Sequence, residues 1–260
     1  MARPGDPDRV VELPGPWAHR DVAANGARFH VVEADLPAAY TDDPRLVVLV
    51  HGFPHFWWAW RDQLPALAAA GYRAVALDLR GYGGSDKTPD GYDPQTLAGD
   101  LSGVIKALGE RNAVVVGHGW GGYVAWATAI LHQREVSALG VVSAPHPRAM
   151  LRRLTAYPSS PAMRHVLAMQ VPWRPERRLA DPASGFLADH LSGWASPSSG
   201  YPTADLVATY QDAIGLWPSS HCALEYHRWL VRSRLRADGR AFDRALRAPV
   251  GQPVLSVRGA

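Results

Sequence analysis

Cysteine and long apolar runs are nearly absent from this sequence. The only cysteine, Cys222, cannot form a disulfide bond within the chain, which is typical of a reducing compartment. No catalytic motif surrounds it, so we interpret it as a small buried hydrophobic residue. No stretch approaches the ~20 apolar residues of a membrane-spanning helix, and residues 1–6 lack the apolar segment of a signal peptide. We therefore expect a cytoplasmic protein without a membrane partner.

Lysine is also scarce, since it occurs only at Lys87 and Lys106, and arginine carries most of the positive charge behind the net charge of +3. Many arginines lie between Arg228 and Arg247, at irregular spacing and mixed with leucines. No nucleic-acid-binding motif or regular aromatic interleaving accompanies them. We interpret this stretch as a solvated helical face and expect no nucleic-acid partner.

The part of the sequence that is rich in apolar residues follows a regular rhythm. With 47% hydrophobic residues, the chain can bury one large core. Apolar runs typical of buried parallel strands alternate with helical patterns, and residues 27–32 alternate like an antiparallel edge strand. The buried strands are predicted at 45–50, 72–79, 114–116, 138–144 and 253–259, and the helices at 57–71 and 93–108. This order predicts an α/β fold with a doubly wound, mostly parallel sheet.

The segment from Val114 to Gly122 organises the rest of the chain. A β-branched run stops at a glycine-rich turn and continues as a helix of small residues. This layout is typical of a nucleophile elbow, in which one side chain stands up in a strained turn at the top of a parallel sheet. That position is Gly119, so the turn is present but its chemical group is missing.

Strand patterns stop after residue 147, and prolines break up the helical segments that follow. We predict three parts: an α/β core over 1–147, an inserted α-helical lid over 148–247, and an incomplete return to the core over 248–260.

Three motifs together resemble the epoxide hydrolases of the α/β-hydrolase superfamily. They are His51-Gly52-Phe53-Pro54, the loop from Asp78 to Asp86, and Gly117-His118-Gly119-Trp120-Gly121-Gly122. The resemblance is good over residues 25–147, looser in the lid, and returns in the final strand. It implies an α/β-hydrolase fold whose last strand and helix are missing from this sequence. Tryptophan after the nucleophile position favours the epoxide hydrolase and haloalkane dehalogenase branch over serine esterases.

The resemblance also implies a mechanism and its residues. In this family the elbow bears an aspartate that attacks the epoxide, and a histidine oriented by a carboxylate activates water to cleave the ester. The backbone N–H groups at Phe53 and Trp120 would form the oxyanion hole, with Pro54 after a cis peptide bond. A small hydrophobic, epoxide-like molecule is the implied ligand, and neither cofactor nor metal ion is expected.

The side chains that this mechanism needs are missing. Gly119 has no carboxylate, and we expect His118 to point away from the pocket. The resemblance places the orienting carboxylate and the histidine in loops after the strand that ends at Gly259, so neither is in the 260 residues. Without a neighbouring strand, the apolar residues at 254–257 should form an exposed edge.

Two lid tyrosines of the family bind the epoxide oxygen. One falls at His227, next to Tyr226, and the other falls near residues 165–170, where this sequence has no tyrosine. The alternatives are Tyr157, Tyr201 and Tyr210, which are more typical of lid packing. The full set of candidate substrate contacts is His51, Pro54, Tyr226 and His227, although a histidine at a strand end is more often structural.

Three interpretations remain open. The chain is an epoxide-hydrolase-like enzyme impaired by the change at Gly119, a pseudoenzyme that binds a small hydrophobic molecule, or an incomplete part of a longer active enzyme.

Overall fold

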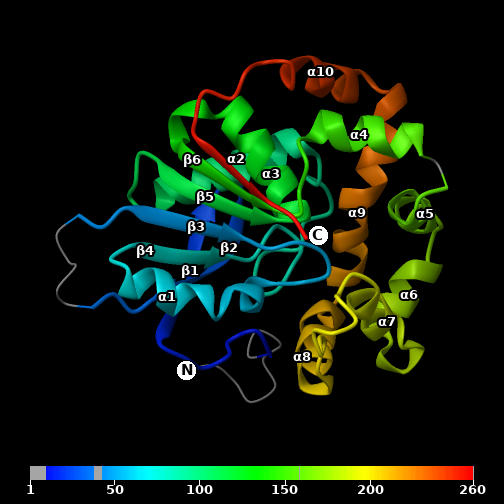
Figure 1. Ribbon diagram of the computed structural model, residues 1–260, viewed down its shortest axis with the longest axis horizontal. Coiled ribbons are helices and arrows are strands. Elements are labelled where there is room, and N and C mark those ends of the chain that lie inside the picture. Colours follow the sequence, from blue (N-terminus) through cyan, green and yellow to red (C-terminus); the bar gives the residue numbers. More distant parts are fainter. Residues whose placement is uncertain (1–9, 38–42, 158, 260) are drawn as a thin grey trace.

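The computed structural model describes residues 10–37, 43–157 and 159–259, and a central sheet organises them (Figure 1). The sheet has seven strands in the order β1-β2-β4-β3-β5-β6-β7. Strands β1 and β2 pair antiparallel, as do β2 and β4, and every other pair is parallel. The predicted mostly parallel sheet is therefore confirmed. The strands are β1 (Trp17–Ala24), β2 (Ala27–Ala34), β3 (Leu46–Val50), β4 (Arg73–Leu77), β5 (Ala113–His118), β6 (Val136–Val142) and β7 (Val254–Val257).

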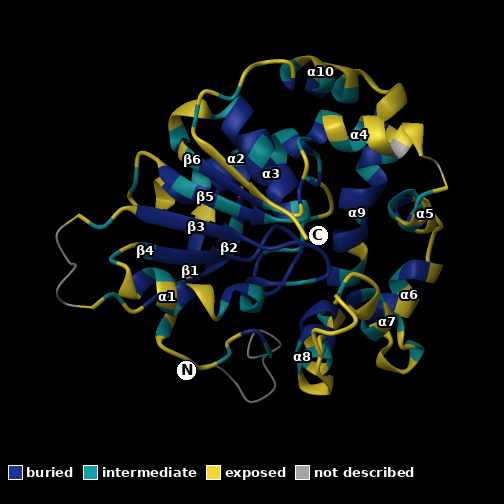
Figure 2. Ribbon diagram, in the orientation of Figure 1, coloured by how far each residue is buried: buried dark blue, intermediate teal, exposed yellow. Residues whose placement is uncertain are grey.

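Strand β3 lies at the centre of the sheet and is buried along its whole length, as its unbroken apolar run predicts (Figure 2). Three helices pack against the strands: α1 (Gln63–Ala69), α2 (Pro94–Ala107) and α3 (Trp120–Leu131). Helix α1 contacts β2 and β4, while α3 contacts β5, β6 and α2. Helix α2 begins as predicted, because the Asp93 side chain accepts a hydrogen bond from the N–H of Thr96.

The segment from residue 148 to 247 is helical. Its elements are α4 (Pro147–Ala156), α5 (Pro161–Ala168), α6 (Arg174–Ala180), α7 (Phe186–Gly193), α8 (Ala204–Gly215), α9 (Ser219–Arg232) and α10 (Ala237–Ala245). Short 3-10 turns lie at Trp57–Trp60, Gln133–Glu135, Pro182–Ser184 and Ser233–Leu235 in the part of the chain that the structure describes. Helices α5 to α9 form a block at one end of the sheet (Figure 1). We call residues 148–247 the helical segment.

Two predictions about the core need correction. Residues 27–32 pair antiparallel as expected, but they are not an edge, because β1 lies outside them. Most residues of β1 are at least partly exposed, so its sequence lacks a buried-strand signal. The stretch predicted as one helix over 57–71 is a 3-10 turn followed by α1. Pro65 explains the break, because it has no N–H and its ring would clash with the carbonyl group of Arg61 in a continuous helix.

The predicted burial of Cys222 is confirmed, since it is 1% exposed. The predicted solvent exposure of the arginines is confirmed for most of those in residues 228–247, but it is wrong for Arg228. That side chain is 3% exposed and forms ion pairs with Glu176 at 2.6 Å and Glu225 at 3.1 Å. In the part of the chain that the structure describes, no helix is both long and apolar enough to cross a bilayer.

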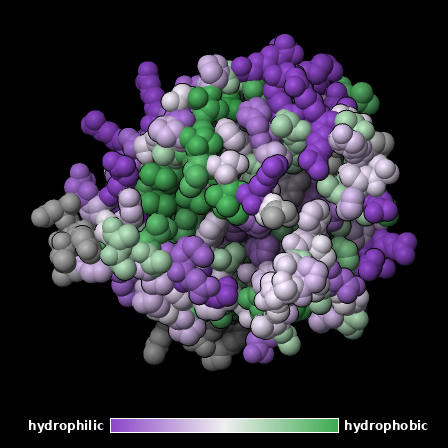
Figure 3. Space-filling model, in the orientation of Figure 1, coloured by the Kyte–Doolittle hydropathy of each residue, from purple (hydrophilic) through white to green (hydrophobic). Residues whose placement is uncertain are grey.

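Strand β7 forms one edge of the sheet, and its residues are exposed as predicted. The exposed fractions of Val254, Leu255 and Val257 are 42%, 67% and 48%. Figure 3 shows hydrophobic side chains gathered over this side of the sheet and hydrophilic ones over α10.

Candidate functional site

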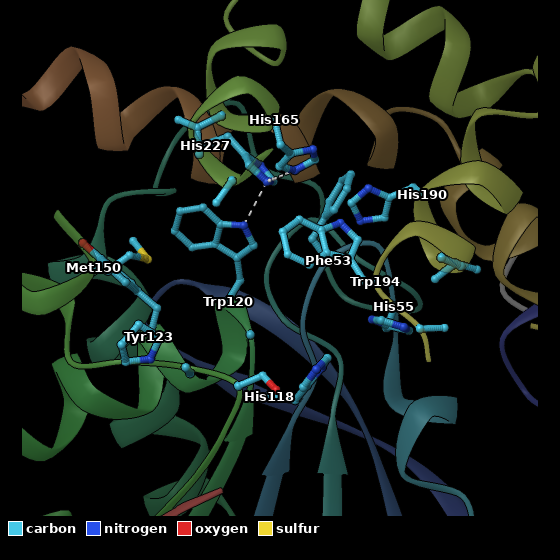
Figure 4. A pocket seen from close by; sticks show the side chains of 18 of the residues that line it. Phe53, His55, His118, Trp120, Tyr123, Met150, His165, His190, Trp194 and His227 are labelled. Atoms are coloured by element: carbon cyan, nitrogen blue, oxygen red, sulfur yellow. Dashed lines mark hydrogen bonds between the residues drawn. The ribbon is translucent and has the colours of Figure 1, made fainter. Parts of the chain in front are cut away.

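A cavity of about 600 Å³ lies between the carboxyl ends of the parallel strands and the helical segment (Figure 4). Loops after β3 and β6, the junction of β5 with α3, and helices α4, α5, α7 and α9 all contribute to its lining. Much of the wall is apolar or aromatic: Phe53, Trp120, Met150, Val166, Leu191 and Leu230. This size and composition are typical of a small-molecule site at the switch point of an α/β sheet.

The predicted elbow is present at the floor of this cavity. Strand β5 ends at His118, α3 begins at Trp120, and Gly119 between them has φ of 52° and ψ of −118°. Close packing of α3 on the sheet requires glycine at 121, because a Cβ there would collide with the carbonyl oxygens of Val50 and His51. At Gly119, by contrast, an added Cβ would have only Gly52 Cα nearby, at 3.7 Å. There is room for a side chain at the tip of the elbow, and the sequence supplies none.

Two backbone N–H groups near the elbow belong to the predicted oxyanion hole. Phe53 and Trp120 both line the cavity, and the Phe53–Pro54 peptide bond is cis, as expected. Neither N–H donates to any acceptor among the described residues. Trp120 is also the first residue of α3, so its N–H adds to the partial positive charge of that helix end. The two donors predicted for the oxyanion hole are therefore free of chain acceptors among the described residues.

The side chains of Trp120, His227 and His165 form a hydrogen-bonded chain in the cavity wall. Trp120 Nε1–H donates to His227 Nε2 at 2.9 Å, and His165 Nε2 lies 3.1 Å from the same nitrogen (Figure 4). An indole N–H can only donate, so His227 Nε2 must accept and its proton is on Nδ1, which lies 3.3 Å from the carbonyl oxygen of Ala223. His165 must then carry its proton on Nε2. These histidines stand in the regions where the family resemblance places two tyrosines.

Histidine is the main titratable residue of the cavity. Five histidines line it: His55, His118, His165, His190 and His227. Burial lowers the pKa of His165 to about 4, and burial together with the charge of His165 lowers the pKa of His190 to about 4. At neutral pH these side chains are uncharged. No group of three or more His, Cys, Asp or Glu residues in the described chain is arranged to hold a metal ion.

The expectation that His118 points away from the pocket is wrong. His118 lines the cavity, and its ring centroid lies 5.6 Å from that of His55. Sequence reasoning also missed His55, His165 and His190 as cavity residues. Two of these residues carried a signal in the sequence. His55 directly follows the motif that ends at Pro54, and His165 lies in the region where the resemblance places a tyrosine. His190 carries no such signal, because α7 brings it to the cavity only in the folded chain.

Three of the candidate substrate contacts lie outside the cavity lining. Tyr226 is buried, and its hydroxyl donates to the carbonyl oxygen of Arg80 at 2.8 Å. His51 is fully buried, with Nε2 accepting from the N–H of Leu79 and Nδ1 hydrogen-bonded to Gly52 O. Pro54 does not line the cavity either. Among the four candidates, only His227 reaches the cavity.

The alternative tyrosines differ in position as well. Tyr201 lines the cavity, and its hydroxyl lies 3.3 Å from His55 Nε2. Tyr210 is buried and packs against His55 without lining the cavity, and Tyr157 is 63% exposed.

Comparison with known proteins agrees with this geometry. Residues 45–221 match the model of the α/β hydrolase fold family. Epoxide hydrolase B of Mycobacterium tuberculosis is 46% identical over 129 residues, which are 49% of this chain and 35% of that protein. Epoxide hydrolase A of the same organism is 43% identical over 148 residues, or 56% of this chain and 44% of that protein. The matched region thus spans less than half the length of these curated relatives.

Solved structures match over most of this chain. The epoxide hydrolase from an endophytic Streptomyces superimposes with a TM-score of 0.78 and 30% identity, over 95% of this chain and 80% of that one. Epoxide hydrolase A from Mycobacterium thermoresistibile gives a TM-score of 0.75 and 27% identity, over 94% of this chain and 82% of that one. The chain therefore belongs to the α/β-hydrolase fold family, and within it is related to the epoxide hydrolases.

Proposed function

We propose that this chain binds a small hydrophobic molecule in the cavity and does not open an epoxide with its own side chains. The observation that carries the proposal is Gly119 at the tip of the elbow. Without a side chain there, no nucleophile stands where the fold would present one, and the described lining contains no carboxylate. A longer product with further residues after 260 would still have glycine at this position.

Three features support the binding part of the proposal. The cavity has the volume and apolar wall of a ligand site, and its backbone donors at Phe53 and Trp120 have no chain acceptor. The relatives are named for hydrolysis of epoxides, so a small hydrophobic compound is the ligand class to test first. In this proposal residues 148–247 act as a lid, while 1–147 and 248–260 form the core.

Thermal unfolding with a neutral probe, 1-naphthylacetamide, tests the binding. A ligand that binds only the folded state raises the melting temperature. We expect this rise in the unmodified chain and in Ala66→Trp, whose new side chain lies on the exposed face of α1. We expect its loss in Ala162→Trp, which fills the cavity from α5. Equal shifts in both variants, or none in the unmodified chain, would contradict binding in this cavity.

Incubation with styrene oxide tests the second half of the proposal. Diol formation should not exceed that of a heat-inactivated sample, because the chain cannot form the ester intermediate. Multiple turnovers by protein of verified mass would overturn the non-catalytic assignment while leaving the binding result intact.

A further inference from the structure

The charge of the cavity lining restricts the kind of ligand that it can hold. Among the described residues that line it there is no aspartate, glutamate, lysine or arginine. A cationic ligand would therefore lose its hydration without gaining a counter-charge. An anionic ligand meets no negative side chain, and it finds hydrogen-bond donors and uncharged histidines.

The donors for an anion are concentrated at the floor. The N–H groups of Phe53 and Trp120 have no acceptor in the described chain, and α3 contributes the positive end of a helix of 12 residues. Gly119 leaves the space above this floor open, since the nearest atom to an added Cβ would be 3.7 Å away. A ligand group can approach the backbone more closely here than any side chain would allow.

His55 supplies a second and independent observation at the floor. Its Nδ1 is buried without any partner, while its Nε2 lies 3.3 Å from the hydroxyl of Tyr201. His55 also lines the cavity, so a carboxylate bound beside its ring would stabilise the protonated form of the imidazole. The ring of His118 stands beside it, at a centroid distance of 5.6 Å.

We propose that the ligand is a small amphiphilic carboxylic acid, bound as its carboxylate against the N–H groups of Phe53 and Trp120 above Gly119. Its apolar part lies along Phe53, Val166 and Leu230. A carboxylate has two acceptor oxygens, one for each of the two free N–H groups, and such charge-assisted hydrogen bonds are stronger than neutral ones. This inference rests on the proposed function, because it names the ligand of the same cavity.

Proton uptake should accompany binding. The groups that face His55 are His118, His51, His190 and two tyrosines, with no carboxylate among them. Burial and the neighbouring histidines hold the pKa of His55 well below its ordinary value, and burial lowers the pKa of His118. A bound carboxylate raises both pKa values again. By linkage, the acid should bind more tightly as pH falls from 8 to 6.

Calorimetric titration with two matched probes tests the inference. 1-Naphthylacetate and 1-naphthylacetamide share their ring and length and differ in charge. At pH 7 we expect the acid to bind at least about tenfold more tightly than the amide. Lowering the pH to 6 should tighten binding of the acid further and leave the amide unchanged. Equal affinities, or binding of the amide alone, would overturn the carboxylate assignment while the proposed binding function stands; binding of neither probe would overturn both.

Gly119→Asp and Gly119→Asn locate the carboxylate. The two variants share the same backbone strain at φ of 52° and ψ of −118°, and both have room for a Cβ. They differ in charge at the floor. Gly119→Asp should weaken the acid at least about tenfold relative to Gly119→Asn, with similar amide binding in both as the check on folding. Undiminished acid binding by Gly119→Asp would overturn the assignment, and if that variant does not fold, the comparison of the two probes on the unmodified chain decides the question.

Discussion

Trp120 determines the protonation of the two histidines that face it. Its indole N–H can only donate, so Nε2 of His227 accepts and Nε2 of His165 must carry a proton. At neutral pH the Nε2 atoms of both histidines are therefore used in hydrogen bonds within the protein. In the described chain, the backbone N–H groups of Phe53 and Trp120 and the Nδ1 atom of His55 are among the polar groups at this site that have no partner.

The hydrogen bond between Trp120 and His227 can be measured by a double-mutant cycle. Trp120→Phe and His227→Phe should each lower the free energy of unfolding by about 1–2 kcal/mol. His227→Phe leaves the indole N–H of Trp120 without an acceptor, and Trp120→Phe removes one of the two donors to His227 Nε2. The double variant should lose less than the sum of the two. Trp126→Phe is the control, because the indole of Trp126 donates to Ala144 O and its effect should add to that of His227→Phe. Additive losses in the first cycle would contradict the bond.

At the scale of single elements, the elbow depends on how closely α3 approaches the neighbouring strand. Strand β3 passes under the first turn of α3, where Gly121 lies against the carbonyl groups of Val50 and His51. This contact explains why the turn persists without its nucleophile. Gly121 is required by the packing of helix on sheet, whereas a Cβ at position 119 would meet only Gly52 Cα, at 3.7 Å.

Replacing Gly121 tests this separation of roles. Gly121→Ala should destabilise the fold by about 3 kcal/mol, because a Cβ would meet backbone atoms that cannot move aside. Gly215→Ala is the matched control: it lies at the end of α8, and an added Cβ there has no neighbour within 4 Å. The control should change stability by less than about 1 kcal/mol. Urea unfolding measures both, and equal effects would contradict the close packing.

Some elements of the fold could be predicted from sequence patterns alone, and others could not. The patterns of β3, β5, β6 and α2 are strong because these elements bury continuous apolar runs or amphipathic faces. Strand β1 escaped prediction because most of its residues are exposed at least in part, so pairing with β2 rather than burial defines it.

Across the whole molecule, buried titratable groups link folding to pH. His30 and Asp78 form a buried ion pair at 2.8 Å. Burial opposes charge on both, yet the hydrogen bond and charge of the partner raise the pKa of His30 and lower that of Asp78. The contribution of His30 is therefore complete below pH 6.5 and is lost as pH rises through its raised pKa. That of Asp78 is present above pH 3.8 and is lost as pH falls through its lowered pKa.

The cavity histidines act in the opposite sense to His30. His165 and His190 have a pKa of about 4 in the folded protein, against 6.5 for an ordinary histidine. The unfolded chain binds more protons between these values, so stability should fall as pH drops from 6.5 towards 4. By pH 5 the loss should be up to about 2 kcal/mol for each. Urea unfolding at several pH values measures it. A double variant, His165→Phe with His190→Phe, should flatten the profile, and an unchanged slope would contradict the assignment.

The sequence by itself determined the alternation of strands and helices, the elbow between β5 and α3, and the absence of a side chain at Gly119. These features depend on periodicity and turn chemistry, which act between residues that are close along the chain. Only the tertiary structure decided which histidines face one cavity and that Tyr226 turns to Arg80 instead. His165 and His227 are 62 residues apart and meet because α5 and α9 pack over the elbow. Such contacts depend on how distant helices dock, and no local pattern records that docking.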